Sequence, residues 1–400
     1  MNIFIDVTSA CRSAQNTGMQ RMTRKIFAEL SRRAPVHLVC WNPVGDRYTD
    51  LGGAELRFLT RPFDAHGPAM ARPEWRGHDP ITEFCRLLVR HPVDVDKEIG
   101  SDDVFLIPDI YRDSRRKMLP NFIKRTSART VAIFHDATDL RLTSVYGDRG
   151  RKSRPYIESL ASFDLVICVS EEARRDLHHF WKEYGCGETE TRVEYWPGEL
   201  EGADHAGDPE SASDSVIYVS SFHARKNHLR LLRVAENLWQ QGVTFELQLI
   251  GRDVGLPFNK IVRQIRALQI CGRRLRWLRH VDDDRLLRAY RECRFTVYPS
   301  LMEGYGLPIV ESLLHGKPCI CGENGALGEV ARGGGCLIVD QTSDDSLADG
   351  IRKLLTDRQL YLGLCRESRE RRFRSWADYI DKLLSYFQRL RHASSLAGVG

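Results

Sequence analysis

The sequence predicts an α/β fold with two domains, each built on a parallel, doubly wound sheet. Short apolar runs of strand type alternate with helical segments through both halves of the 400-residue chain. This alternation is typical of parallel sheets that are covered by helices. A polar, acidic stretch at 197–214 separates the halves, as interdomain linkers do. A third observation is a strand, glycine loop and helix at 298–316, an arrangement that binds ligands in open α/β sheets.

The first half supports this fold element by element. Ser170 suits the first position of a helix as an N-cap. The Pro-, Gly- and Arg-rich region 43–103 is the part of the first half whose elements the sequence predicts least well. We expect a helix at 18–33 and strands at 3–7, 36–41, 104–107, 131–134, 165–169 and 192–195.

The second half repeats the pattern after the polar stretch. We expect strands at 216–220, 244–250, 275–278, 295–298 and 337–339. Helical patterns fall at 227–241, 259–268, 283–293, 344–355, 359–371 and 375–390.

The composition limits the class of protein and its setting. With 42% hydrophobic and 28% charged residues, the chain resembles an ordinary globular protein. No apolar run approaches the roughly 20 residues of a membrane span. The first residues look like a buried strand without signal-peptide features, so we expect a cytoplasmic location. Eleven cysteines without a C-x-x-C pair indicate reduced thiols and give no metal-binding pattern. A net charge of only +5 argues against nucleic acid binding.

The stretch from Tyr298 to Gly316 carries the most chemistry. Glu303 stands just before a loop with two glycines, and Glu311 lies in the helix that follows. Carboxylates suit sugar or ribose hydroxyls, and the N–H groups of a helix start suit phosphate. The alternative is that Glu311 complements the helix dipole and that Glu303 is solvated.

The string Glu303-Gly-Tyr-Gly-Leu-Pro-Ile-Val-Glu311, preceded by Tyr298-Pro-Ser300, resembles the E-x7-E signature of retaining glycosyltransferases of family GT4. The resemblance implies a GT-B fold, in which two Rossmann-like domains face each other across a cleft. It places an acceptor-side domain at 1–196 and a nucleotide-sugar domain at 215–374. Phe373-Arg-Ser-Trp376 is similar to the point where the family's last helix, here about 375–391, returns to the first domain.

A second polar loop, Ser220 to His228, follows the first strand of the second half. Arg225 offers a planar fork for phosphate oxygens and Lys226 a compact charge, although a solvated basic turn is the alternative. GT4 proteins hold the nucleotide diphosphate with an Arg and a Lys at this place. Arg225-Lys226-Asn227 resembles an R-K-N variant of that pair, in which Arg225 supplies the guanidinium.

Two residues of the first half complete the expected site. Phe134-His135-Asp136 matches the family's I-H-D segment, where the histidine lies near the transferred sugar; a structural histidine at a strand end is the alternative. Gly18 begins the first helix, where the family uses a glycine so that the backbone approaches the donor phosphate. The resemblance thus makes Glu303, His135, Arg225 and Lys226 catalytic. It assigns donor binding to Gly18, Arg225, Lys226, Glu303, Gly304, Tyr305, Gly306, Leu307 and Glu311.

The resemblance implies a retaining, metal-independent sugar transfer from a nucleotide sugar. It requires no cofactor, and the chain shows no D-x-D motif for a metal. The R-K-N variant and the opening segment, including Asn16-Thr-Gly-Met-Gln-Arg21, are similar to bacterial polysaccharide-assembly members, many of which use GDP-mannose. The residues do not reveal the base of the nucleotide, the sugar that is transferred or the linkage that is formed.

The partner on the acceptor side is expected to be a saccharide or a lipid-linked saccharide. Residues 111–154 hold twelve basic and four acidic side chains, which suits an anionic glycan, a diphosphate-linked lipid or peripheral contact with the inner membrane. A scatter of solvated arginines is the alternative. Competing functions are an inverting GT-B transferase or nucleotide-sugar epimerase, and a noncatalytic glycan-binding protein.

Overall fold

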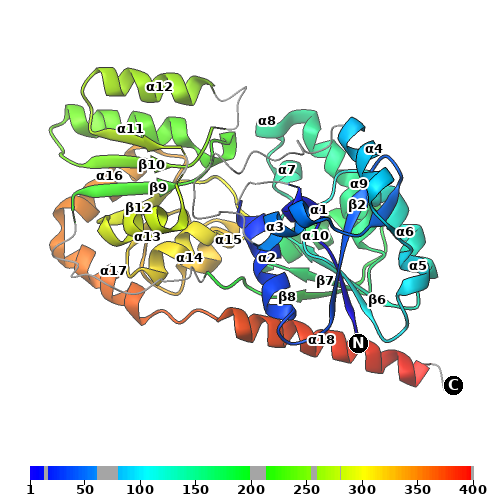
Figure 1. Cartoon of the computed structure of the whole chain (residues 1–400). Coiled ribbons are helices and arrows are strands. Elements are labelled where there is room, and N and C mark those ends of the chain that lie inside the picture. Colours follow the sequence, from blue (N-terminus) through cyan, green and yellow to red (C-terminus); the bar gives the residue numbers. More distant parts are fainter. Residues whose placement is uncertain (13–16, 61–79, 199–212, 254–258, 280, 398–400) are drawn as a thin grey trace. The chain divides into compact units, whose positions relative to one another are not determined.

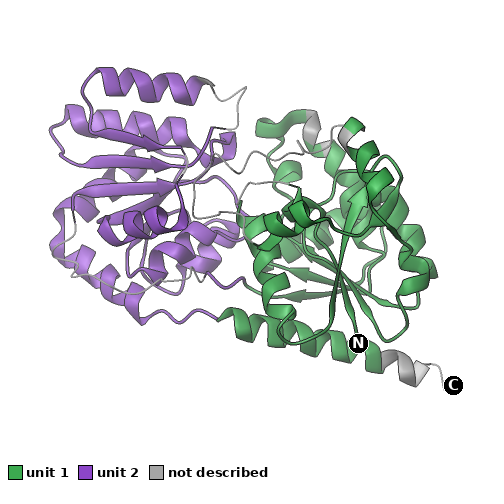
Figure 2. Cartoon of the chain, viewed as in Figure 1, with its two compact units in different colours: residues 1–195, 375–400 green, residues 196–374 purple. Residues whose placement is uncertain are grey.

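The computed structural model describes residues 1–12, 17–60, 80–198, 213–253, 259–279 and 281–397. The chain divides into two compact units (Figure 2). Unit 1 comprises Met1–Tyr195 together with Ser375–Gly400, and unit 2 comprises Trp196–Arg374. The linker that we expected at 197–214 lies mostly outside the described residues. Within the described residues, no helix is long and apolar enough to cross a membrane.

Unit 1 is built on one eight-stranded sheet with the order β4-β3-β2-β1-β5-β6-β7-β8 (Figure 1). Six of the strands run parallel, whereas β3 pairs antiparallel with both β2 and β4 at one edge. The central strands are fully buried, as expected when helices cover both faces. The strands are β1 (Ile3–Asp6), β2 (Val36–Asn42), β3 (Arg47–Thr49), β4 (Pro92–Val93), β5 (Val104–Ile107), β6 (Arg129–Phe134), β7 (Leu165–Cys168) and β8 (Glu190–Val193).

The helices of unit 1 connect and cover these strands. Ser170 caps α10 as expected, because its hydroxyl accepts a hydrogen bond from the Ala173 backbone at 3.0 Å. The expected strand at 192–195 instead spans Glu190–Val193. The helices are α1 (Thr8–Cys11), α2 (Gly18–Leu30), α3 (Gly53–Thr60), α4 (Pro80–Val89), α5 (Val95–Glu98), α6 (Arg115–Arg125), α7 (Thr138–Arg141), α8 (Thr143–Tyr146), α9 (Arg154–Leu160), α10 (Glu171–Tyr184) and α18 (Trp376–Ala397).

The last helix, α18, belongs to unit 1 although it follows unit 2 in the sequence (Figure 1). It buries Trp376, Tyr379, Leu383 and Phe387 and packs against α2. The Tyr386 hydroxyl donates a hydrogen bond to Glu194. The chain therefore completes the core of its first unit with its final element.

Unit 2 contains a parallel six-stranded sheet with the order β11-β10-β9-β12-β13-β14. The two α/β sheets, parallel except at the β3 edge of unit 1, match the fold class that the sequence predicts. The strands are β9 (Ser215–Val219), β10 (Glu246–Ile250), β11 (Leu275–Leu278), β12 (Phe295–Tyr298), β13 (Cys319–Cys321) and β14 (Cys336–Ile338). The helices are α11 (His228–Gln240), α12 (Asn259–Ile270), α13 (Asp283–Glu292), α14 (Leu307–Leu314), α15 (Gly325–Ala331), α16 (Asp344–Thr356) and α17 (Arg358–Glu370).

Candidate donor-binding site

The candidate site of unit 2 forms where two adjacent central strands end. Strands β9 and β12 pair in parallel, so their carboxyl ends lie at the same edge of the sheet. The turn Ala224–Lys226 follows β9, and the loop that begins at Pro299 follows β12. The Leu301 backbone N–H donates to the Arg225 carbonyl at 2.8 Å. This hydrogen bond ties the two predicted motifs to each other.

Glu303 lies between the two predicted cations. Its Oε2 is 2.5 Å from Arg225 Nη1, and its Oε1 is 2.5 Å from Lys226 Nζ. The three side chains are 9–19% exposed, so water screens the pairs only partly. Arg225, Lys226 and Glu303, which the sequence predicts as one site from two distant motifs, therefore make direct contact.

The charge of Glu303 is stabilised by its neighbours. Burial by itself would raise the pKa of this carboxyl, but the charges and hydrogen bonds of Arg225 and Lys226 outweigh burial and hold it well below its usual range. The Ser300 hydroxyl also donates to Glu303. Glu303 is consequently an anion across the physiological pH range.

Lys226 and Arg225 are held in place by further contacts. Lys226 Nζ donates to the Tyr298 hydroxyl at 2.6 Å, and Arg225 Nη1 donates to the Met302 carbonyl at 2.9 Å. The Tyr218 hydroxyl donates to the Lys226 carbonyl at 2.6 Å. Rigid cations of this kind lose little side-chain entropy when they bind an anion.

The glycine loop adopts the backbone that its residues predict. Gly306 has φ 114° immediately before α14, a conformation that favours glycine. Pro308 lies in the first turn of α14, where its missing N–H costs nothing. Leu307 is buried, and the Tyr305 ring contacts the Trp196 ring with centroids 6.4 Å apart. Gly304 lies in the turn between Glu303 and Tyr305.

Glu311 occupies a more buried position than Glu303, Arg225 and Lys226. It is 2% exposed, and its Oε2 accepts a hydrogen bond from the Tyr290 hydroxyl at 2.8 Å. Tyr290 stacks in turn on His315, with ring centroids 5.0 Å apart. Sequence reasoning missed Tyr290, because its position in an amphipathic helix marks it only as a core residue.

A set of side-chain hydrogen bonds, which the sequence analysis also missed, supports the loops that follow β9 and β12. Gln341 Nε2 donates to Asn324 Oδ1 at 2.5 Å, and Asn324 Nδ2 donates to the Leu301 carbonyl at 2.7 Å. Asn227 Nδ2 donates to the Gln341 carbonyl at 2.8 Å. Asn227 has a positive φ of 60°, which asparagine tolerates better than most residues. The R-K-N motif is the only sequence signal that could have identified Asn227 as a residue of the site.

His135 and Gly18 lie in unit 1. His135 follows β6 and is 2% exposed, with Nε2 2.8 Å from the Pro108 carbonyl. Burial lowers the pKa of its imidazole. Gly18 begins α2 directly after Thr17, whose hydroxyl caps the helix together with Gln20. Both residues thus follow the carboxyl ends of parallel strands, β6 and β1.

Around Glu303 the site of unit 2 is cationic, because Arg225 and Lys226 both pair with this carboxylate. The pKa of His223 is lowered to about 4 by burial and by the charges of Arg225 and Lys226, so His223 is neutral at physiological pH. Among the described residues, no group of three or more His, Cys, Asp or Glu side chains is arranged to hold a metal ion. Such a site can hold an oxyanion and a polyhydroxylated ligand side by side.

Comparison with known proteins identifies related sequences. Residues 207–371 match the model of the family described as glycosyl transferases group 1. The serotype-specific mannosyltransferase WbdA of Escherichia coli is 22% identical over 353 residues, which cover 82% of this chain and 40% of WbdA. The O-antigen chain mannosyltransferase B of Escherichia coli is 37% identical over 259 residues, 60% of this chain and 64% of that protein. The chain therefore spans about two fifths of the length of WbdA.

Solved structures share the fold along nearly the whole chain. Sucrose-phosphate synthase from Thermosynechococcus elongatus matches with a TM-score of 0.71 at 16% identity, covering 98% of this chain and all of that one. Anabaena HepE, solved in complex with UDP and glucose, matches with a TM-score of 0.62 at 15% identity, covering 97% and 99%. At such low identity the likeness concerns the fold, which is the GT-B fold.

Proposed function

This chain is a member of the group 1 glycosyltransferases, family GT4, and on that basis we propose that it moves a sugar from a nucleotide diphosphate sugar to a saccharide or lipid-linked saccharide acceptor. The mannosyltransferases among its relatives support mannose as the sugar, and we favour GDP-mannose as the donor. The acceptor then belongs to a surface polysaccharide under assembly. Each of these finer assignments is our proposal.

The contact of Arg225 and Lys226 with Glu303 is the observation that carries the proposal. Arg225 Nη1 and Lys226 Nζ each lie 2.5 Å from a carboxylate oxygen of Glu303. The two cations therefore already bind one anionic group. A diphosphate offers more charge and more acceptor oxygens than one carboxylate does, and it can take over both cations. Glu303 is then released from the cations and can accept hydrogen bonds from sugar hydroxyls.

The transfer itself needs charge stabilisation more than a nucleophile. The bond between the anomeric carbon and the diphosphate oxygen breaks, and negative charge grows on the leaving group. Arg225, Lys226 and the backbone N–H groups from Gly304 to Leu307 at the start of α14 stabilise that charge. The acceptor oxygen bonds to the same face of the anomeric carbon, while its proton passes to the leaving phosphate oxygen. The anomeric configuration is retained, and no divalent metal enters this scheme.

The remaining predicted residues have supporting roles in this proposal. Glu311 binds the ribose hydroxyls, while Tyr305 lines the donor loop. His135 orients the sugar, and Gly18 lets the backbone approach the donor phosphate. These two roles rest on the resemblance to the family, because both residues belong to unit 1.

The proposal is tested first by ligand-induced thermal stabilisation with UDP, GDP, dTDP, CMP and ADP. Ligand at a hundredfold excess over its dissociation constant stabilises the native state by about 2.7 kcal/mol. We expect a rise in melting temperature with one nucleoside diphosphate, GDP in our proposal. Lys226→Ala and Glu311→Ala should both abolish it. Lys353→Ala, which changes a half-exposed lysine of α16, is the matched control and should preserve it. If none of the nucleotides stabilises the wild-type chain, the donor assignment is wrong and a noncatalytic protein becomes the better account.

A further inference from the structure

Tyr290 in α13 makes two contacts with α14, and both helices are labelled in Figure 1. Its hydroxyl donates to Glu311 Oε2 at 2.8 Å. Its ring stacks on His315, with centroids 5.0 Å apart and an angle of 18° between the ring planes. Residues four apart in a helix lie on the same side of it, so Tyr290 spans one turn of α14. The hydrogen bond and the ring contact together fix Glu311 relative to α13.

Tyr290 itself is held by the core of unit 2. It is 0% exposed and belongs to a buried cluster with Leu286 and Cys293 from its own segment and with Ile217 and Ile250 from β9 and β10. A side chain that is packed on all sides keeps one rotamer. The Tyr290 hydroxyl is therefore a stationary donor. A glutamate has several rotatable bonds, and such a donor restricts the direction in which its carboxylate points.

Stability alone does not require a carboxylate at position 311. Ile309, Val310 and Leu313 in the same helix are apolar and 0% exposed, and an apolar side chain at 311 would need no hydrogen-bond donor. Replacing a buried hydrogen-bonded pair by apolar groups of similar shape is nearly neutral for stability or even favourable. A buried glutamate with a dedicated donor is therefore better explained by binding than by folding.

We propose that Tyr290 is a positioning residue, which orients Glu311 toward the ribose hydroxyls of the donor and so makes the site prefer ribonucleotides to deoxyribonucleotides. The inference rests on the proposed function and deepens it. Tyr290 does not touch the donor but acts through Glu311. Because hydrogen bonds are directional, a carboxylate in a fixed orientation binds a ribose hydroxyl better than one that turns. A nucleotide without ribose hydroxyls does not form this bond and binds more weakly.

The test is calorimetric titration of the full chain with GDP and with its dideoxy analogue, which lacks both ribose hydroxyls; UDP and its dideoxy analogue are titrated in parallel. We expect the wild type to bind the ribonucleotide at least about tenfold more tightly, as hydrogen bonds to a carboxylate imply. Tyr290→Phe keeps the ring and its stacking on His315 but removes the hydroxyl. It should weaken binding of the ribonucleotide by about tenfold and leave binding of the dideoxy analogue nearly unchanged.

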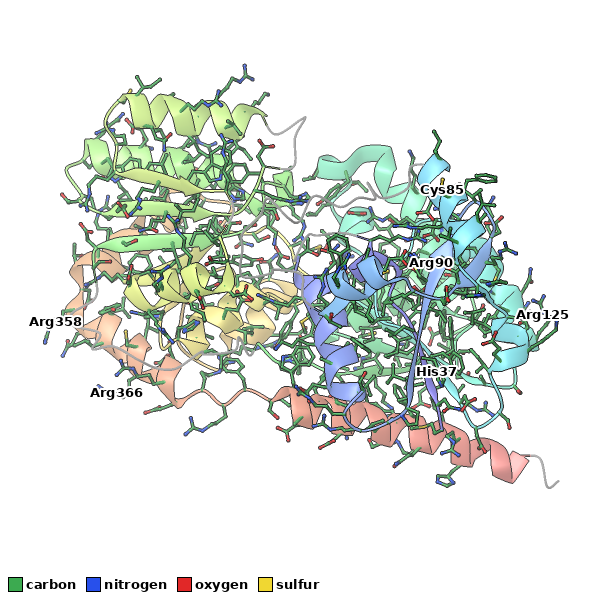
Figure 3. The ribbon with its side chains drawn as sticks, in the orientation of Figure 1. His37, Cys85, Arg90, Arg125, Arg358 and Arg366 are labelled. Atoms are coloured by element: carbon green, nitrogen blue, oxygen red, sulfur yellow. The ribbon has the colours of Figure 1, made fainter. Side chains whose placement is uncertain are left out.

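Two further variants separate positioning from a general loss of structure. Tyr361→Phe is the matched control, because it also removes a buried tyrosine hydroxyl from unit 2, and it should keep the wild-type preference. Tyr361 belongs to α17, the helix on which Arg358 and Arg366 are labelled in Figure 3. Glu311→Asp keeps the carboxylate but shortens the side chain, so it cannot reach Tyr290 and the ribose at once. It should lose the preference as Tyr290→Phe does.

The possible outcomes are distinct. A wild type that binds ribonucleotide and dideoxy analogue equally would overturn the inference and leave the proposed function standing. So would a Tyr290→Phe variant that weakens both nucleotides equally or keeps the full preference, because Tyr290 would then have only a structural role. If Tyr290→Phe does not fold, a full preference in Glu311→Asp would overturn the inference in its place. A wild type that binds none of these nucleotides would refute the proposed function and the inference with it.

Discussion

At the scale of single residues, the contact of Glu303 with two cations explains how the site stays ordered before a donor binds. Without this carboxylate, Arg225 and Lys226 would repel each other in a partly buried place. In the proposed function the carboxylate is also a competitor, because a donor phosphate would have to displace it from both cations. On this proposal we expect Glu303 to affect donor binding and sugar transfer in opposite directions.

Replacing Glu303 by glutamine should separate these two effects. The amide keeps the shape but not the charge, so the affinity for a nucleoside diphosphate should rise by about tenfold, the equivalent of about 1.4 kcal/mol. Sugar transfer should fall, because the amide holds sugar hydroxyls less well. Calorimetric titration measures the affinity, and Glu323→Gln at an exposed position of the same unit serves as control. An unchanged or weaker affinity would show that Glu303 does not compete with phosphate.

His228 makes the stability of unit 2 depend on pH. Its ring contacts the rings of Tyr218 and Phe222, each with its centroid 4.6 Å away. Burial together with the charge of Lys226 lowers the pKa of His228 to about 3. In the unfolded chain the pKa is about 6.5. Between these pH values His228 therefore binds a proton in the unfolded state but not in the folded state. The free energy of unfolding consequently falls as the pH drops from about 6.5 towards 3. The slope from this group is at most about 1.4 kcal/mol per pH unit.

The variant His228→Phe should remove this contribution. Urea denaturation of both proteins at neutral pH and near pH 5 measures it as the difference between their losses of unfolding free energy. Equal losses in the two proteins would contradict the assignment to His228.

At the scale of elements, the glycine loop before α14 depends on one backbone conformation. Gly306 has φ 114°, and an added Cβ would lie 3.4 Å from the Ile309 side chain. Space is therefore adequate, but the backbone angle is strained for any other residue. We expect Gly306→Ala to cost about 1–3 kcal/mol or to shift the loop. Nucleotide affinity should fall more than it does in Gly363→Ala, where a Cβ meets no neighbour. Equal affinities in both variants would place the loop outside the site.

The sequence could predict most elements of unit 2 because each strand there is short, apolar and followed by a helix with clear periodicity. The strands at Leu275–Leu278 and Phe295–Tyr298 agree residue by residue with their predicted spans. The strands at the edge of the unit 1 sheet were harder to predict. Strands β3 and β4 have three and two residues, which are too few for a periodic signal. Charged residues of α4 face inward in ion pairs, which reverses the pattern that sequence reasoning expects.

The candidate site was predictable only in part for a physical reason. Cations and carboxylates at strand ends are visible as motifs, so Arg225, Lys226 and Glu303 were found from the sequence. Tyr290 and Gln341 reach the site from other segments and act through hydrogen bonds to Glu311 and Asn324. Their roles depend on tertiary contacts, which no local pattern of residues reveals.

At the scale of the whole molecule, unit 1 depends on the last helix of the chain. Helix α18 buries several large apolar side chains in unit 1, each contributing about 1.5–3 kcal/mol, and together they rival the 5–15 kcal/mol of a typical domain. A chain truncated after Arg374 should therefore lose the fold of unit 1, and limited proteolysis should degrade residues 1–195 first. Nucleotide binding to unit 2 should persist at reduced affinity. Survival of a protease-resistant unit 1 would contradict this account.

The most direct test of the central claim is the rate at which the full chain releases GDP from GDP-mannose in the presence of a mannosyl acceptor. We predict release by the wild type that Lys226→Ala lowers by at least about a hundredfold, as is usual for the loss of a group that stabilises transition-state charge. Lys353→Ala should match the wild type. Absence of release with GDP-mannose but turnover of another nucleotide sugar would correct the donor alone. Absence of release with every nucleotide sugar, or equal rates in Lys226→Ala and wild type, would contradict the role that we give to this site.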